Sequence, residues 1–281
     1  MGTDKTDGLF DRFRIDGQIC IITGGAGLMG DSHARAVIGG GGIPVLIDIS
    51  GKRLNEEKTR LMADFPDCTV EVENADITSK DELEDIRDRI MAKYGHIDIL
   101  INNAANNPKV EDGRKSSFYF ENISRSVWDA DLSVGLTGAF LCSQVFGAQM
   151  AKAGRGVILN ISSDLGVIAP DQRIYEKASE TGDNQMKKPV TYSVVKHGII
   201  GLTKYIATYW ADSGVRCNAI CPAGIENGQD EEFKSKLLNL VPMGRMAAKD
   251  EYEATALYMI SDASRYMTGA ALVIDGGRTC W

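Results

Sequence analysis

Short apolar runs alternate along this chain with longer segments in which apolar residues recur at helical spacing. The runs lack an alternating polar face, which is typical of strands buried on both sides in a parallel sheet. We expect strands at 18–23, 43–49, 69–76, 98–102, 157–161, 215–220 and 271–274. We expect helices at about 27–39, 51–64, 79–94, 124–153, 190–213 and 249–261. This alternation predicts an α/β fold, with a doubly wound and mostly parallel sheet of about seven strands and helices on both faces.

The predicted elements form one domain over residues 17–281, preceded by a polar lead-in over residues 1–16. Two long polar segments interrupt the pattern. Asn106–Asn122 follows the fourth strand, so we expect it at the carboxyl edge of the sheet, where ligands bind in such folds. Ala169–Pro189 carries four acidic and four basic side chains, and we expect it to form a surface insertion.

The charge balance limits the partners. Lys and Arg number 31 against 39 Asp and Glu, and the net charge of −8 argues against nucleic acid or an anionic membrane. The six cysteines are scattered, and the CxxxC pair of Cys217 and Cys221 is a poor metal signature. We therefore expect free thiols and no metal site. The polar N-terminus shows no apolar segment of the secretory type, so we expect a cytoplasmic protein.

A glycine-rich turn joins the first strand to the first helix in the stretch ICIITGGAGLMG, residues 19–30. Glycines let the backbone approach phosphates, and a helix N-terminus offers free N–H groups, so this stretch predicts a dinucleotide diphosphate site in a Rossmann-type domain. Asp48 ends the second strand 18 positions beyond Gly30, near where such units bind the adenosine ribose with an acid. A 2′-phosphate would meet this charge, so we expect NAD rather than NADP, although Lys52 and Arg53 weaken the preference.

Tyr192 and Lys196 lie four residues apart on a predicted helix, so they share one face. A nearby ammonium favours the phenolate and lowers the pKa of the phenol. A phenol tuned in this way passes a proton to or from a carbinol near neutral pH. Ser163, at the end of the preceding strand, is expected to hydrogen-bond the same oxygen. The three side chains suit hydride transfer at a C–O centre beside a dinucleotide.

Six motifs in sequence order resemble the short-chain dehydrogenase/reductase family over nearly the whole chain. They are TGGAGLMG at 23–30, NNAA at 102–105, NISS at 160–163, YSVVK at 192–196, PAGI at 222–225 and DGG at 275–277. The resemblance implies that Tyr192 is the general acid/base, that Ser163 holds the substrate oxygen, and that Lys196 binds the nicotinamide ribose. It implies cofactor contacts at Gly24, Met29, Gly30, Asp48, Asp76, Ile77, Asn102, Ala104, Tyr192, Lys196, Pro222, Gly224 and Ile225. It also implies a homodimer or homotetramer packed through the helices at 124–153 and 190–213.

Three positions depart from the family pattern. Leu28 stands in the glycine turn where Gly or Ala is usual, and it would either push the backbone away from the phosphates or pack below them. Gly135 stands where the family has a fourth catalytic member, an asparagine whose carbonyl helps hold a water on the proton path. Ser163 and Tyr192 are 29 positions apart, roughly twice the family interval, which places the 169–189 insertion beside the active site.

We therefore predict an NAD(P)(H)-dependent oxidoreductase that interconverts a secondary alcohol and a ketone on a polar small molecule. The polar segments favour such a substrate over a steroid or a long acyl chain. The insertion followed by PVTYSVVK resembles family members associated with bacterial surface-sugar pathways, which makes a sugar derivative a candidate. Two alternatives stay open: a sugar dehydratase or epimerase that retains its NAD, and a dinucleotide-binding protein with weak or no turnover.

Overall fold

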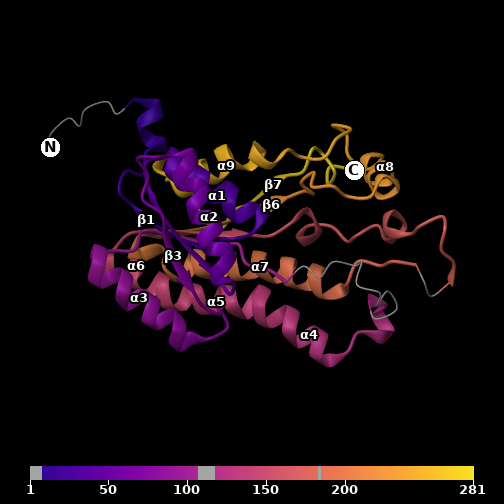
Figure 1. The fold of residues 1–281 in the computed structure, drawn as a ribbon, viewed down its shortest axis with the longest axis horizontal. Coiled ribbons are helices and arrows are strands. Elements are labelled where there is room, and N and C mark those ends of the chain that lie inside the picture. Colours follow the sequence, from indigo (N-terminus) through magenta and orange to yellow (C-terminus); the bar gives the residue numbers. More distant parts are fainter. Residues whose placement is uncertain (1–7, 107–117, 183–184) are drawn as a thin grey trace.

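A single parallel sheet forms the centre of the computed structural model, which describes residues 8–106, 118–182 and 185–281 (Figure 1). Its strands run in the order β3-β2-β1-β4-β5-β6-β7, and every neighbouring pair is parallel. The strands are β1 Ile19–Thr23, β2 Ile43–Asp48, β3 Glu71–Asn74, β4 Ile99–Asn102, β5 Gly156–Ile161, β6 Val215–Pro222 and β7 Ala271–Ile274. The predicted doubly wound sheet of seven strands is confirmed.

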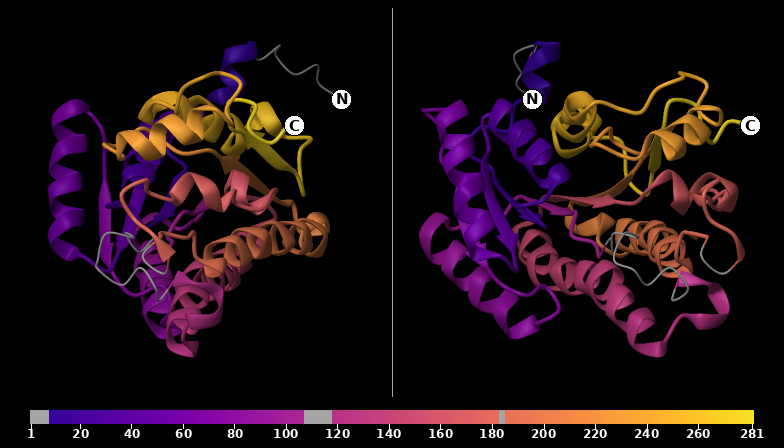
Figure 2. Two further views of the ribbon diagram at one scale, coloured as in Figure 1. Left: turned by 90° about the vertical axis from the view of Figure 1, so that its right-hand side faces the viewer. Right: turned by 45° about the vertical axis from the view of Figure 1, so that its right-hand side comes forward.

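Helices cover both faces of this sheet (Figure 2). Buried side chains of α1, α2 and α9 form the core on one face, and those of α3, α5, α6 and α7 form the core on the other. The helices are α1 Leu28–Gly39, α2 Gly51–Asp64, α3 Lys80–Tyr94, α4 Arg125–Leu132, α5 Ala139–Cys142, α6 Ala148–Ala153, α7 Val190–Tyr209, α8 Glu231–Leu238 and α9 Glu253–Ile260.

Local sequence signals account for most helix ends. Helix α3 begins after Ser79, whose Oγ accepts a hydrogen bond from the Glu82 N–H at 3.4 Å. The expected capping box is only half formed, because the Glu82 carboxylate accepts from the Asp76 N–H instead. Gly95 ends the helix with a positive φ of 80°. The chain enters the core before β1, since Ile15 is fully buried and its N–H donates to the Gly40 carbonyl.

Two π-helical segments, Ser133–Gly138 and Ser143–Gly147, join α4, α5 and α6 into the one long helix that the sequence predicts at 124–153. By length and composition alone this helix could cross a bilayer, but half of its most apolar window is buried. It packs against α3 and α7, and its buried apolar residues belong to the core of the domain. Wide π turns of this kind are frequent near functional sites.

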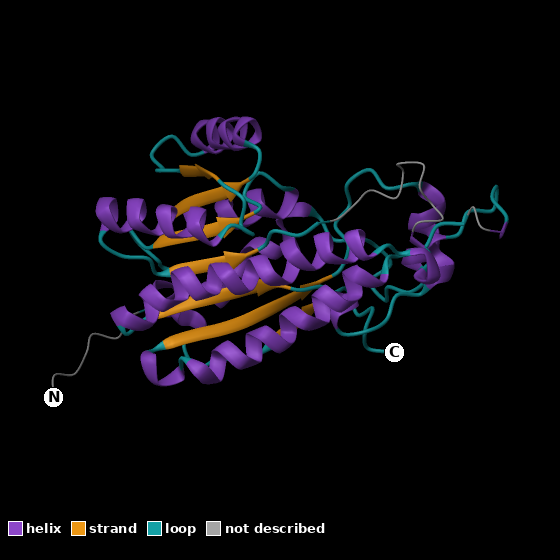
Figure 3. Cartoon of the chain, turned by 90° about the horizontal axis from the view of Figure 1, so that it is seen from below, coloured by secondary structure: helices purple, strands orange, loops and turns teal. Residues whose placement is uncertain are grey.

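The order in which the chain adds strands to the sheet reverses at β1, because β1 is hydrogen-bonded to β2 on one side and to β4 on the other. Helices that leave the carboxyl ends of these strands diverge and open a crevice, which is where ligands bind in open α/β sheets. Figure 3 shows the long loops and short helices gathered beyond one end of the strands. The fold therefore brings the segments after β1, β4, β5 and β6 to the same edge.

A buried network of amide and hydroxyl side chains holds the ends of β4 and β5 against the neighbouring helices. Asn102 Nδ2, at the end of β4, donates to Ser143 Oγ at 3.0 Å and to Asn160 Oδ1 at 2.8 Å. Asn160 Nδ2, in β5, donates to Thr203 Oγ1 on α7 at 2.8 Å. All four side chains are nearly or fully buried, so their polar atoms depend on one another for hydrogen bonds.

Replacing Asn160 is expected to destabilise the fold. Asn160→Ala leaves one N–H of the Asn102 amide without its acceptor and removes the hydrogen bond that Thr203 Oγ1 accepts. Leaving a buried polar group unsatisfied costs about 1–3 kcal/mol. Urea unfolding is the measurement, with Asn55→Ala as control because the Asn55 side chain is bonded at an exposed helix surface. A loss for Asn160→Ala no larger than that of the control would contradict the role given to the network.

Candidate active site

The glycine turn after β1 has no room for side chains at two positions. Gly24 has a φ of +63°, and a Cβ there would lie 2.9 Å from the Ala104 Cα. A Cβ on Gly30 would lie 2.7 Å from the Gly25 carbonyl oxygen. The first turn of α1 therefore packs directly on the glycine turn, in the close approach that a diphosphate site requires.

Helix α1 opens without a side-chain cap, because its N-cap residue is Gly27. The N–H groups of Leu28, Met29 and Gly30 have no partner inside the helix and point out of its positive end. This donor set fits a dinucleotide diphosphate. The Leu28 side chain is 37% exposed, so it does not pack below the turn, and the backbone there follows a regular helix.

Asp48 lies beside the turn at the end of β2. Its carboxylate accepts from the Ser50 N–H at 3.1 Å and from the Ala26 N–H at 3.3 Å. The Arg53 guanidinium donates to the Ala26 carbonyl from the other side. A ribose bound at this end of β2 would therefore meet both a carboxylate and a guanidinium.

The NNAA segment after β4 is tied to the turn by a residue that the sequence analysis did not single out. Asn103 Nδ2 donates to the Thr23 carbonyl at 3.0 Å and to the Gly24 carbonyl at 3.2 Å. The Ala104 N–H donates to Thr23 Oγ1 at 3.0 Å. Asn102, which we expected near the adenosine ribose, turns its side chain into the buried amide network. A doubled asparagine at a strand end was the available signal, since neighbouring residues in a strand face opposite ways.

The two residues expected beside the adenine lie just beyond β3. Asp76 is exposed, and its carboxylate accepts from the N–H and the hydroxyl of Thr78 at 2.8 Å each. Ile77 is buried and contacts the α4–α6 helix at Gly138. Their contact with an adenine stays a prediction.

Ser163, Tyr192 and Lys196 come together where β5 ends and α7 begins, although Ser163 and Tyr192 are far apart in sequence. Ser163 lies close enough to the Tyr192 hydroxyl to lower the pKa of the phenol. Lys196 Nζ donates to the Ile161 carbonyl of β5 at 2.8 Å and lies 5.7 Å from the centroid of the Tyr192 ring. The structure thus assembles the predicted hydroxyl, phenol and ammonium in one place.

The expected lowering of the tyrosine pKa is not found. Burial raises the pKa of Tyr192, and the nearby Ser163 hydroxyl lowers it by less. The sequence could not show this, because burial depends on how α7 packs. Burial also lowers the pKa of Lys196 to about 8, and the nearby charge of Lys188 acts in the same direction.

A buried ion pair, which the sequence analysis also missed, supports the serine. Ser163 Oγ donates to Asp164 Oδ1 at 2.7 Å, and Asp164 Oδ2 pairs with Arg278 Nη1 at 2.6 Å. Both charged side chains are almost fully buried. The available signals were an acid directly after the serine and a cation directly after DGG, both at the carboxyl edge of the sheet.

Gly135 lies in the first π-helical segment, in contact with α7. A Cβ at this position would lie 2.6 Å from the Val195 Cγ1, so the packing of the two helices excludes a larger residue. Gly135 also lines a niche of about 10 Å³ together with Asp131, Thr191, Tyr192 and Lys196. Asp131 accepts hydrogen bonds there from Thr191 Oγ1 at 2.5 Å and from Asn106 Nδ2 at 3.2 Å.

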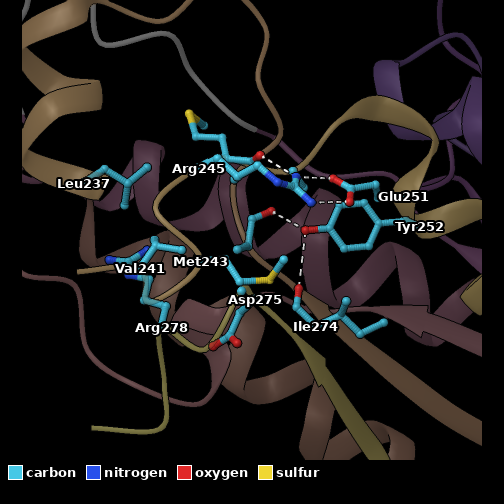
Figure 4. Close-up of a pocket in the computed structure, with 14 residues that line it drawn as sticks. Leu237, Val241, Met243, Arg245, Glu251, Tyr252, Ile274, Asp275 and Arg278 are labelled. Atoms are coloured by element: carbon cyan, nitrogen blue, oxygen red, sulfur yellow. Dashed lines mark hydrogen bonds and ion pairs between the residues drawn. The ribbon is translucent and has the colours of Figure 1, made fainter. Parts of the chain in front are cut away.

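A pocket of about 130 Å³ adjoins this group (Figure 4). It lies between the segment after β6 and the end of β7, and Gly224, Tyr252, Asp275 and Arg278 are among its lining residues. The Tyr252 hydroxyl lies 3.2 Å from the Ala223 carbonyl and 3.3 Å from the Ile274 carbonyl, which holds the two strand ends together. Arg278 lines the pocket and also pairs with Asp164, which is bonded to Ser163. Arg278 therefore connects the pocket to Ser163.

The residues expected beside the nicotinamide lie at the mouth of this pocket. Pro222 is the last residue of β6. Gly224 lines the pocket, and a Cβ there would lie 2.9 Å from the Met246 Cε. Ile225 is buried and bridges to Ala247. Their contact with a nicotinamide stays a prediction.

Comparison with known proteins gives consistent results. A family model described as enoyl-(acyl carrier protein) reductase matches residues 26–279. The chain is 30% identical to a D-threitol dehydrogenase of Mycolicibacterium smegmatis, over 95% of each protein. It is 31% identical to an NAD-dependent glycerol dehydrogenase of Listeria innocua, over 96% of this chain and 97% of that protein.

A solved structure of a short-chain dehydrogenase from Leptospira borgpetersenii with bound NAD⁺ is also similar. It superposes with a TM-score of 0.82 at 28% identity and covers 99% of both chains. The protein therefore belongs to the short-chain dehydrogenase/reductase family, and it is an NAD(P)-dependent oxidoreductase that interconverts an alcohol and a ketone on a polar substrate.

Proposed function

We propose that Ser163, Tyr192 and Lys196 carry the catalysis, that NAD is the preferred cofactor, and that the substrate is a polyol or a sugar-derived alcohol. The observation that carries the assignment of residues is their convergence at the carboxyl edge of the sheet, with Ser163 beside the Tyr192 hydroxyl and the Lys196 ammonium nearby. Relatives named for threitol and glycerol support the substrate class.

Tyr192 is the proton carrier in this proposal. As a phenolate, it takes the hydroxyl proton of the bound alcohol, and as a phenol it returns a proton to a ketone oxygen. The Lys196 ammonium stabilises the phenolate from the same helix face. A bound NAD would supply the hydride acceptor or donor. The α1 N-terminus would hold its diphosphate, Asp48 its adenosine ribose, and the segment around Gly224 its nicotinamide.

Ser163 is oriented by its surroundings to accept a hydrogen bond. Its hydroxyl proton points to Asp164, and one lone pair accepts from the Leu165 N–H at 3.1 Å. A serine oxygen has two acceptor positions, so one is left for the Tyr192 hydroxyl or for the hydroxyl of an alcohol substrate. A ketone oxygen has no proton to give to that position. This arrangement favours binding of the alcohol.

The cofactor preference rests on Asp48. Its carboxylate lies at the end of β2 beside the turn, where a ribose diol finds an acceptor and a 2′-phosphate meets a negative charge. Arg53 offsets this charge only in part, because its guanidinium is bonded to the Ala26 carbonyl.

We also propose a cytoplasmic homodimer or homotetramer that packs through the α4–α6 helix and α7. Four large apolar or aromatic side chains on these helices are exposed in the single chain: Phe140, Val194, Tyr205 and Tyr209. The Tyr205 and Tyr209 rings stack with centroids 5.7 Å apart, which makes a continuous aromatic surface. Burial of such a surface is what an obligate interface requires.

Cofactor titration tests the role of Asp48. Quenching of intrinsic fluorescence is expected to show NADH binding at least about tenfold more tightly than NADPH, which corresponds to about 1.4 kcal/mol. Asp48→Ala is expected to bring the two affinities together, while Asp67→Ala, which removes an exposed acid elsewhere, leaves their ratio unchanged. Equal affinities in the unmodified protein would contradict the NAD preference, and binding of neither cofactor would contradict the oxidoreductase assignment.

Tyr192→Phe tests the proton carrier. Turnover of polyols with NAD, followed at the absorbance of NADH, is expected to fall about 10²- to 10⁴-fold, since general acid–base catalysis contributes that much. Tyr205→Phe, an exposed change on the same helix, is the control.

The pH dependence gives a second readout for Tyr192. Because burial raises the pKa of Tyr192, the phenolate is scarce at neutral pH, and the oxidation rate is expected to rise with pH from neutral to alkaline values. Tyr192→Phe should abolish that rise. A cofactor that stays bound and shows no net reduction with any alcohol would instead support a dehydratase or epimerase.

Restoring the family asparagine tests the packing at Gly135. Gly135→Asn is expected to lower the free energy of unfolding by about 1–3 kcal/mol, because its Cβ would collide with Val195. Adding Val195→Ala should recover part of the loss. Gly201→Asn is the control, because a Cβ at Gly201 meets nothing within 4 Å. Full stability of Gly135→Asn alone would show that the asparagine is absent for another reason.

A further inference from the structure

Lys188 places a second ammonium against the catalytic tyrosine. Its Nζ lies 3.7 Å from the centroid of the Tyr192 ring, closer than Lys196 Nζ at 5.7 Å. Lys188 comes from the end of the insertion and precedes α7 by two residues. No role has been given to it so far.

The backbone of Lys188 is held in place by Gln172, at the other end of the insertion. Gln172 Oε1 accepts from the Lys188 N–H at 2.9 Å, and Gln172 Nε2 donates to the Lys188 carbonyl at 3.3 Å. The buried Pro189 follows and leads into α7. The backbone that carries this ammonium is therefore fixed and is not a free loop end.

Lys188 differs from the other cations of the insertion in having no carboxylate partner. Arg173 pairs with Asp171 at 2.6 Å, Lys177 with Asp230 at 3.5 Å, and Lys187 with Glu176 at 2.7 Å. Within the part of the chain that the structure describes, no ion pair and no hydrogen bond of the Lys188 ammonium is found, and the ammonium lies over the face of the Tyr192 ring.

The nearby acids are already engaged. Asp164 is bonded to Ser163 and to Arg278, and Asp131 is bonded to Thr191 and Asn106. Both raise the pKa of Lys188 from a distance, yet burial dominates and lowers it to about 8. Lys188 is half-buried. A charge that is partly withdrawn from water and has no partner is costly, and natural structures tend to pair such charges.

We propose that the Lys188 ammonium binds a carboxylate of the substrate, so that the substrate class is a hydroxy acid such as an aldonate or a uronate. This inference rests on the proposed role of Tyr192, because the anion is placed by its distance from the tyrosine. A single free ammonium matches a monoanionic carboxylate, whereas a phosphate dianion draws several donors at once. The carbinol that reaches Tyr192 and the carboxylate that reaches Lys188 belong to one small molecule.

Matched substrate pairs test the proposal. Threonate, gluconate and galactonate are compared with threitol, glucitol and galactitol, each pair sharing a carbon chain and differing in the terminal group. In the unmodified enzyme, at least one acid is expected to exceed its alditol about tenfold or more in kcat/KM with NAD, the range of one charge-assisted hydrogen bond.

Variants then assign that preference to Lys188. Lys188→Met is expected to reduce kcat/KM for the acid about tenfold more than for the alditol, mainly through KM, and Lys188→Arg should keep most of the preference. Lys187→Met is the matched control, because it removes the neighbouring lysine that already pairs with Glu176. Calorimetric titration of each protein in complex with NADH, using gluconate and glucose 6-phosphate as probes, reads carboxylate and phosphate binding without turnover.

Each outcome decides the matter. Equal losses on acids and alditols would place the effect on the tyrosine and overturn the substrate assignment. Turnover of alditols with no acid preferred, or tighter binding of the phosphate probe, would overturn it while leaving the proposed function intact. Failure to bind NADH would overturn the proposed function itself, and in that case gluconate binding to the free protein that is lost in Lys188→Met alone would still support the subsite.

Discussion

The position of β1 between β2 and β4 is the constraint on which the active site depends. Because both neighbours are parallel to β1, all three carboxyl ends meet at one edge, and the chain leaves them in opposite directions. The glycine turn, Asp48 and Asn103 are brought together only by this pairing. The hydrogen bonds from Asn103 to the carbonyls of Thr23 and Gly24 show that the turn after β1 is held in shape by the segment after β4.

Positive and negative side chains are distributed unevenly around Ser163 and Tyr192. Asp164 and Arg278 form a buried ion pair whose opposite charges cancel. The pair orients Ser163 and adds no net charge beside Tyr192. Lys196 and Lys188 both lie near the face of the Tyr192 ring, and no carboxylate of the described residues forms an ion pair with either of them. The site is therefore electropositive although the whole chain carries a net charge of −8. Such a local field attracts negative charge, whether it develops on the phenolate or arrives with a ligand.

The sequence predicted those parts of the structure that depend on neighbours along the chain. Helix α2, the start of α3 at Ser79, the glycine turn and the shared face of Tyr192 and Lys196 all follow from local spacing. Contacts between distant residues were not predictable: Asp164 and Arg278 are separated by 114 positions. The raised pKa of Tyr192 was missed for the same reason, since burial arises from packing. The inward orientation of the Asn102 side chain and the two π-helical segments were not predicted. Each depends on a shift of one residue along the strand or helix, which the pattern of apolar residues does not reveal.

The hydrogen bonds between Gln172 and Lys188 have a consequence for how this enzyme can change over evolution. They close the insertion at its base, so its exposed residues can vary without displacing Lys188 or the start of α7. Loops whose ends are fixed tolerate such variation well. Ser163, Tyr192 and Lys196 lie outside this closed segment. Exposed positions within residues 173–187 can therefore change without touching these three side chains, which makes them a natural target for directed evolution.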